Sequence, residues 1–228
     1  MLSFYSLVAS LGIVHLYDSY NNVPRLQAGS YNTIYPLYVT LFNGYIQSYL
    51  IDSFAVYKLE TNYTFTNTLF APIIYFILQD IYFYITHRLA HTVLYKYFHK
   101  MHHTHKAPDI FTTFYENPVE HILIWTMPYM LPHIIGINQI SYWLFVFYTT
   151  FLSVIGHCGS NYKANIWYAG YIWSAAPISH YYTFGHSYHH DIHHEKTNCN
   201  YGLWFTFMDE QFGTQYENYK SYIPLKFH

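Results

Sequence analysis

The sequence predicts an all-α fold, a multi-pass membrane helical bundle of about four transmembrane helices arranged in two hairpins. Charged residues make up only 10% of the 228 residues, whereas an average soluble domain has about 25%. Charges are also absent from four long stretches, at residues 1–17, 26–51, 61–79 and 121–162. The length suits a single membrane-embedded domain over residues 1–228.

The mean hydropathy of only +0.02 does not contradict a membrane protein. Aromatic residues form 23% of the chain, and 29 of them are Tyr, which hydropathy scales treat as polar. A Tyr ring nevertheless buries a large apolar body and suits a membrane interface. The net charge of −2 leaves no basic face for nucleic acid, and two cysteines cannot build a disulfide scaffold.

Four segments of the chain satisfy the length of about 20 mostly apolar residues that a membrane crossing needs. The first predicted hairpin pairs 34–51 with 69–86, and the second pairs 122–135 with 140–157. Gly136-Ile137-Asn138 supplies the turn of the second hairpin. The N-terminal run lacks the basic start and cleavage site of a signal peptide, so we interpret it as an interfacial helix or a short anchor.

Basic residues set the predicted orientation of these crossings. Arg88, Lys96, Lys100 and Lys106 follow the second crossing closely, which places that stretch on the cytosolic side. Two further crossings return the chain to the same side before residue 186. The segments around residues 87–106, 157 and 186–194 are therefore expected to meet at one cytosolic membrane boundary.

Histidine is the outlier of the composition, because 11 of its 17 copies lie in two short windows, at 87–105 and 186–194. Their spacings of three and four residues place the imidazoles on one face of a helix. A metal site built from helices requires this geometry. We therefore predict a cytosol-facing metal site with these ligands: His87, His91, His99, His102, His103, His157, His190, His193 and His194.

Other polar residues are expected to lie around this predicted site. Asp80 lies seven residues before His87, so we expect its carboxylate to hold a ligand histidine in the correct tautomer. His186 and His189 adjoin the last motif as further ligands or as residues that support the ligands. His105 lies beside the second motif and is likewise expected either to bind metal or to support the ligands, and the remaining histidines, including His121, are expected to be largely structural.

Two other classes of protein also place histidines in membranes. A metal transporter would line a path through the middle of the bilayer, but these histidines cluster at the ends of the crossings. A bis-histidine haem protein would present single histidines that face each other across helices. A redox enzyme that binds its metal through these histidines is the third class. The bound metal distinguishes the three: two irons per chain would support the redox enzyme, and zinc alone would contradict it.

The motifs resemble the membrane-bound fatty acid hydroxylase and sterol desaturase superfamily, whose signature is HxxxH, HxxHH and a second HxxHH. Here these are His87/His91, His99/His102/His103 and His190/His193/His194. The resemblance covers residues 80–214 and includes Pro118-Val119-Glu120, His157-Cys158-Gly159 and Asn200-Tyr201-Gly202. The chain departs from the family at Asn117, where His is usual, and at Met208-Asp209-Glu210, where Trp-Asp-Arg is usual. Asn117 therefore either replaces a ligand or marks a slightly altered site.

Within the superfamily, the third motif is most similar to the sterol C5-desaturases (lathosterol oxidases). The resemblance implies a di-iron enzyme of the endoplasmic reticulum that introduces a C5(6) double bond into a Δ7-sterol with O2 and two electrons. A sterol C4-methyl oxidase or a fatty acid or lipid hydroxylase is the alternative. Electrons would come from NAD(P)H through cytochrome b5 and its reductase, because this chain has no haem motif of its own.

Overall fold

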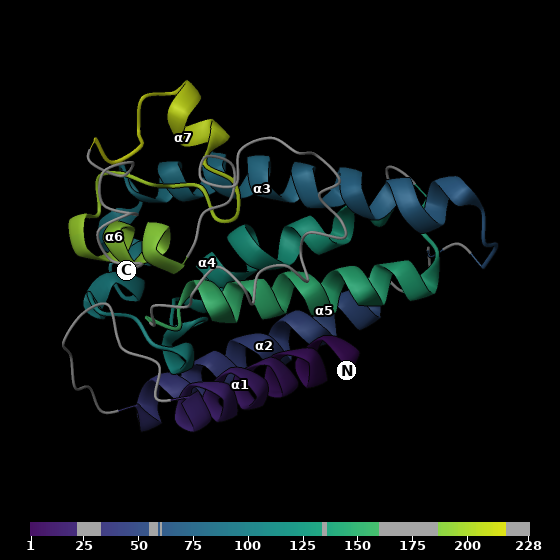
Figure 1. The fold of residues 1–228 in the computed structure, drawn as a ribbon, viewed down its shortest axis with the longest axis horizontal. Coiled ribbons are helices and arrows are strands. Elements are labelled where there is room, and N and C mark those ends of the chain that lie inside the picture. Colours follow the sequence, from purple (N-terminus) through teal and green to yellow (C-terminus); the bar gives the residue numbers. More distant parts are fainter. Residues whose placement is uncertain (22–32, 55–58, 60, 134–135, 160–186, 218–228) are drawn as a thin grey trace.

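The computed structural model describes residues 1–21, 33–54, 59, 61–133, 136–159 and 187–217. Within these ranges the chain forms helices and turns and no β-strand. The four long helices are α1 (Leu2–Asn21), α2 (Ile34–Phe54), α3 (Ala71–Ala90) and α5 (Gln139–Gly156). They lie side by side along one direction, and the short helices gather at one end of this bundle (Figure 1).

Short π-helical and 3₁₀ turns (Tyr95–His99, His102–Thr104 and Ile110–Thr112) follow α3, and the segment that then leads to α5 is helical but irregular. It begins with α4 (Pro118–His121), continues as a π-helical turn (Ile122–Thr126) and ends as a 3₁₀ helix (Met127–His133). Pro128 and Pro132 lack the backbone N–H that an α-helix needs, which accounts for the change of helix type. Two more helices, α6 (Ser187–Lys196) and α7 (Phe207–Gln211), complete the described fold.

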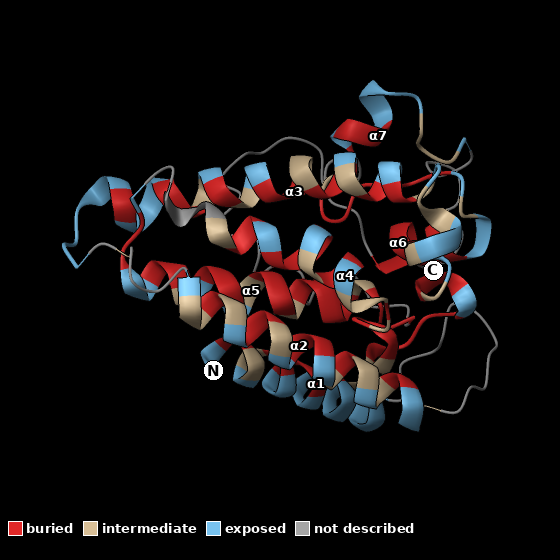
Figure 2. Cartoon of the chain, turned by 180° about the vertical axis from the view of Figure 1, so that it is seen from behind, coloured by how far each residue is buried: buried red, intermediate tan, exposed pale blue. Residues whose placement is uncertain are grey.

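Helices lie where the crossings were expected. The segments predicted at 34–51, 69–86 and 140–157 correspond to α2, α3 and α5, and the segment predicted at 122–135 is irregular as far as it is described, to residue 133. Among the described residues two helices, Thr66–Ala90 and Gln139–Gly156, are apolar and long enough to cross a membrane; the count of four crossings stays a prediction. The outer faces of α1 and α2 are exposed and rich in large apolar side chains (Figure 2), such as Leu16 at 70% and Tyr38 at 68% exposure. This surface suits a lipid environment.

The N-terminal helix α1 is part of the bundle. It packs lengthwise against α5 and α2 (Figure 1), with Leu7, Leu11 and Val14 buried in the core that it shares with them. Its place as an interfacial helix or a short anchor stays a prediction.

Asn138 connects the starts of α3 and α5 and so determines which ends of the bundle carry the histidines. Its side-chain oxygen accepts a hydrogen bond from the Ser141 amide at 2.9 Å and caps α5, as the predicted turn required. Its Nδ2 donates to Thr68 Oγ1 at 2.8 Å, just before α3. Because both helices start at this point and have similar lengths, His87 and His157 arrive at the same opposite end.

Candidate metal centre

The structure brings the eight histidines of the three motifs together with His157 at that end of the bundle. They form two groups, and in each group the candidate ligand nitrogens lie within 4.8 Å of one another. We call the groups site 1 and site 2. Site 1 consists of His87, His91, His99, His103 and His193, and site 2 consists of His102, His157, His190 and His194.

Each HxxHH motif contributes to both sites, which the spacing alone did not indicate. Histidines four residues apart share a site, as His99 and His103 do in site 1 and His190 and His194 do in site 2. The remaining histidine of each motif belongs to the other site. The second motif does not lie on one regular helix, because His99 ends a π-helical turn and His102 begins a 3₁₀ turn. Neighbouring histidines thus connect the two sites directly.

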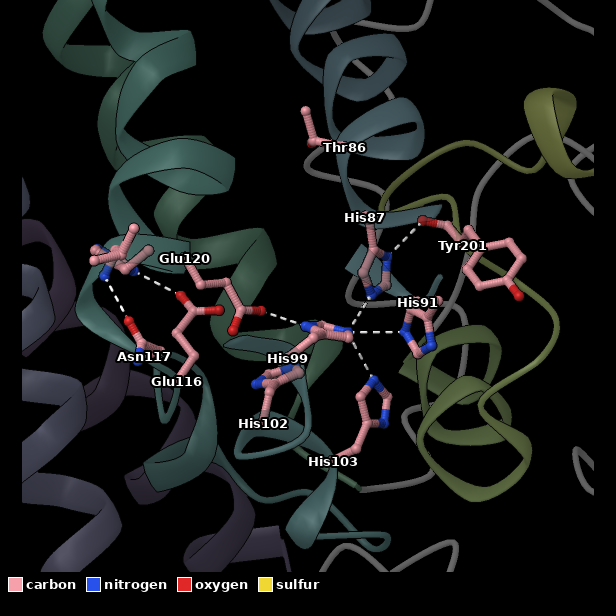
Figure 3. Close-up of polar contacts among 12 residues, drawn as sticks. Thr86, His87, His91, His99, His102, His103, Glu116, Asn117, Glu120 and Tyr201 are labelled. Carbon is pink, nitrogen blue, oxygen red and sulfur yellow. Dashed lines mark hydrogen bonds and ion pairs between the residues drawn. The ribbon is translucent and has the colours of Figure 1, made fainter. Parts of the chain in front are cut away.

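Site 1 is organised around the imidazole of His99 (Figure 3). Its Nε2 lies 3.1 Å from His87 Nε2, 2.8 Å from His91 Nε2 and 2.9 Å from His103 Nε2. His193 Nε2 closes the group at 3.0 Å from His91 Nε2. Nitrogens at about 2.1 Å from one metal ion and at right angles to each other would lie about 3.0 Å apart. These spacings therefore fit ligands of a common ion.

Site 2 shows the same arrangement with four histidines, all buried. His190 Nε2 lies 2.9 Å from His157 Nε2 and 3.1 Å from His194 Nε2. His102 Nε2 lies 3.3 Å from His157 Nε2. The sites are neighbours, since the rings of His103 in site 1 and His194 in site 2 have centroids 4.6 Å apart.

The outer nitrogens of four of these rings face backbone carbonyl oxygens, which can only accept hydrogen bonds, and that of a fifth ring contacts a carboxyl group. In site 1, Nδ1 of His87 lies 2.9 Å from the Tyr201 carbonyl and Nδ1 of His193 lies 2.7 Å from the Cys199 carbonyl. In site 2, Nδ1 of His157 lies 2.9 Å from the Ser153 carbonyl, and that of His194 lies 3.0 Å from a carbonyl oxygen. His99 Nδ1 contacts a carboxylate oxygen of Glu120. A neutral imidazole must place its one proton on the nitrogen that donates.

The consequence is that the inner Nε2 atoms carry lone pairs that point at one another. Such an arrangement is repulsive unless a cation lies between the nitrogens. Burial lowers the pKa of His157 to about 4 and that of His193 to about 3, so protons do not supply the cation near neutral pH. The donor sets therefore fit two metal ions, and imidazole suits iron as well as zinc.

Glu120 is a functional residue to which the sequence interpretation assigned no role. It is 3% exposed and contacts His99, the ring at the centre of site 1 (Figure 3). Glu116 lies beside it, and Glu116 Oε1 accepts a hydrogen bond from His121 Nδ1 at 2.7 Å. Burial and the Glu120 carboxylate raise the pKa of Glu116 well above its ordinary value. Burial raises the pKa of Glu120 as well, to about 9, so both carboxyls favour their protonated forms in the metal-free protein. A cation held by site 1 would favour an ionised Glu120 facing His99.

Asp80 is buried but does not hold a histidine, contrary to our expectation. Its Oδ1 accepts hydrogen bonds from the amides of Trp204 at 2.8 Å and Phe205 at 3.3 Å. Asp80 thus anchors the segment after the third motif to α3. The seven-residue spacing to His87 placed both residues on one side of α3, but the nearest partners came from another part of the chain.

Asn117 and His189 also lie outside both ligand groups. The Asn117 side chain accepts a hydrogen bond from the Val119 amide at 2.9 Å and caps α4, a role that Asn performs at many helix starts. His189 Nε2 donates to Asp209 Oδ2 at 3.3 Å. His186 lies outside the described residues. His105, expected as a ligand or a supporting residue, belongs to neither group and packs against the Tyr115 ring. His121, expected to be structural, bonds to Glu116.

The comparisons with known proteins agree with this site. The chain is 28% identical over 217 residues to methylsterol monooxygenase 2-1 of Arabidopsis thaliana, covering 92% of this chain and 71% of that protein. It is 30% identical over 140 residues to a cholesterol 25-hydroxylase-like protein of Danio rerio, covering 60% of this chain and 52% of that protein. A very-long-chain aldehyde decarbonylase of Oryza sativa is 31% identical over 152 residues, covering 64% of this chain and 53% of that protein.

The chain spans about half the length of the first curated relatives it matches. No solved structure is significantly similar to it. The sequence model of the fatty acid hydroxylase family matches residues 72–214, a range that contains all nine histidines of sites 1 and 2. The chain therefore belongs to the fatty acid hydroxylase family.

Proposed function

We propose that this protein oxidises a sterol dissolved in the membrane, using O2 and two iron ions held by sites 1 and 2. The observation that carries the proposal is the convergence of nine imidazole nitrogens in two adjacent groups. Bound iron would supply the activation of O2 that oxidation of an unactivated C–H bond requires. An all-nitrogen donor set suits iron.

The chain's own residues prepare this chemistry in three ways. The carbonyls and the Glu120 carboxylate hold the rings with their Nε2 lone pairs directed inward. Burial excludes water from site 2, where all four histidines are buried. Site 1 lies nearer the surface, because His91 is partly exposed. The bundle would deliver an apolar substrate to its end from the bilayer.

Two reactions of a sterol are compatible with this proposal. The residues around the third motif favour introduction of a C5(6) double bond into a Δ7-sterol. The relatives named methylsterol monooxygenase and cholesterol 25-hydroxylase-like protein favour insertion of oxygen, with a sterol methyl group as one target. Both reactions begin with removal of a hydrogen from carbon, so the same ligands would serve either one.

Expression in two yeast strains tests the reaction, one deficient in sterol C5-desaturase and one deficient in sterol C4-methyl oxidase. Sterol profiling should show restoration of one of the two products, and His102→Ala or His193→Ala should abolish it. Each variant removes a ligand from a different site. Oxidised fatty acids with unchanged sterols would contradict a sterol substrate, and zinc alone in the purified protein would contradict the oxidase.

We further propose an endoplasmic reticulum membrane, with the metal centre at the cytosolic boundary. Electrons would come from NAD(P)H through cytochrome b5 and its reductase. Arg88, Lys96 and Lys100 are exposed, and each lies one to five residues from a site 1 histidine. A basic surface beside the more accessible site supports docking of an acidic electron carrier there.

A further inference from the structure

The carboxylate of Asp209 is the centre of a buried hydrogen-bond network behind site 1. Its Oδ1 accepts from the Tyr201 amide at 2.8 Å and from Thr214 Oγ1 at 2.7 Å. Its Oδ2 accepts from the Gly202 amide at 2.7 Å and from His189 Nε2 at 3.3 Å. Asp209 is 0% exposed, and these four donors use both of its oxygens.

The backbone around Gly202 is shaped for this carboxylate. A Cβ at position 202 would lie 2.8 Å from Asp209 Oδ2 and 2.5 Å from the Phe205 carbonyl oxygen, so a larger residue would displace one of them. Asn200 adopts a left-handed backbone conformation, with φ of 56°, which Asn tolerates better than most residues. The Asn200 side chain donates to the His189 carbonyl at 3.1 Å. The loop at 199–202 is thus held from both sides.

The same loop supplies the carbonyls that orient two ligands of site 1. The Tyr201 carbonyl faces His87 Nδ1, and the Cys199 carbonyl faces His193 Nδ1. These contacts come from the backbone, so no side-chain substitution at 199 or 201 removes them directly. Site 2 uses different supports, including the Ser153 carbonyl within α5. Among the described contacts, the carbonyls of the 199–202 loop therefore meet ligands of site 1 only.

We propose that Asp209, together with its partner His189, is the positioning residue of site 1. Asp209 acts through the Tyr201 and Gly202 amides, which set where the loop carbonyls meet His87 and His193. This inference rests on the metal binding in the proposed function. Residues that orient ligands from outside a metal site typically contribute about 10- to 100-fold to metal affinity.

The test is Asp209→Asn in the full chain, purified in nanodiscs and titrated with Co²⁺ as a spectroscopic probe. The amide of Asn would face donors with its NH2 group, so the loop would lose acceptors while the residue keeps its shape. We expect the wild type to bind two ions per chain and the variant to bind one of them about 10- to 100-fold more weakly. The matched control is Glu210→Gln, on the adjacent exposed residue of α7, which should bind like the wild type.

Two double variants identify the site that is weakened. In a His190→Ala background, which damages site 2, adding Asp209→Asn should weaken the ion that remains. In a His91→Ala background, which damages site 1, adding Asp209→Asn should leave the remaining ion unchanged. Equal weakening in both backgrounds would overturn a role specific to site 1.

A second measurement does not depend on bound metal. Hydrogen exchange of the metal-free protein should show the Tyr201 and Gly202 amides protected in the wild type and faster in Asp209→Asn, with α5 unchanged. A variant with fast exchange in every helix would have lost its fold, and His189→Gln would then provide the milder perturbation of the same network. Absence of bound metal in the wild type would overturn the proposed function, whereas two tightly bound ions in both Asp209→Asn and His189→Gln would overturn only this inference.

Discussion

Replacing Glu120 tests whether the carboxylate that contacts His99 strengthens metal binding at site 1. His99 Nε2 lies within 3.1 Å of three other site 1 nitrogens, so a change in the orientation of this ring affects the whole site. Glu120→Gln keeps an oxygen acceptor for His99 Nδ1 but removes the negative charge that Glu120 would carry beside a metal ion in site 1. Glu120→Ala removes both and leaves a buried N–H without its partner.

The size of the effect follows from the kind of contact that is lost. A hydrogen bond to a charged group contributes about 1.5–3 kcal/mol, and a neutral one about 0.5–1.5 kcal/mol. The difference of roughly 1.4 kcal/mol corresponds to about a tenfold loss of affinity for Glu120→Gln. For Glu120→Ala we expect a loss of about 100-fold, at the upper end for residues that orient metal ligands.

Competition with a chromophoric chelator measures the affinity of each site in the purified protein. Glu116→Gln is the matched control, because Glu116 is equally buried and lies beside Glu120 but contacts His121, which belongs to neither site. It should leave both affinities unchanged. The reasoning would be refuted if Glu120→Gln bound both ions like the wild type, or if Glu116→Gln weakened site 1 as much.

Three further predictions concern the loop, the pH dependence and the electron donor. Gly202→Ala should lower the melting temperature and weaken site 1, because the added Cβ would approach a backbone oxygen to 2.5 Å; unchanged melting would contradict this close approach. The metal-free protein should lose stability as pH falls from about 6.5, by about 1.4 kcal/mol per pH unit for each buried histidine. Stability falls because these histidines take up protons in the unfolded chain below pH 6.5, whereas in the fold the pKa is about 4 for His157 and about 3 for His193. Denaturant titrations at several pH values measure the free energy of unfolding, and a value that does not change with pH would argue against these lowered pKa values. Lys96→Glu with Lys100→Glu should slow reduction by cytochrome b5 in stopped-flow experiments without loss of metal, and an unchanged rate would count against docking at this surface.

The sequence by itself predicted much of the fold, because membrane crossings and helix faces leave regular patterns. The gaps between charges located α2, α3 and α5 to within a few residues. The three- and four-residue spacings identified the nine histidines that the structure brings together. Such patterns are local, and they need only the rise and period of a helix to be interpreted.

The roles of the surrounding polar residues depended on tertiary contacts. Asp80 bonds to amides 124 and 125 residues away, and Asp209 meets His189 only because α6 and α7 approach each other. Asn117, expected near a ligand position, serves its own helix.

What the sequence determined is therefore the set of candidate ligands and the end of the bundle where they gather. Only the tertiary structure decided their division into two sites, since His102 and His103 are neighbours in sequence and belong to different groups. It also showed which rings are oriented by the carbonyls of Tyr201 and Cys199. The physical reason is that every residue carries a backbone carbonyl, so no residue type marks the ones that bind a ligand histidine.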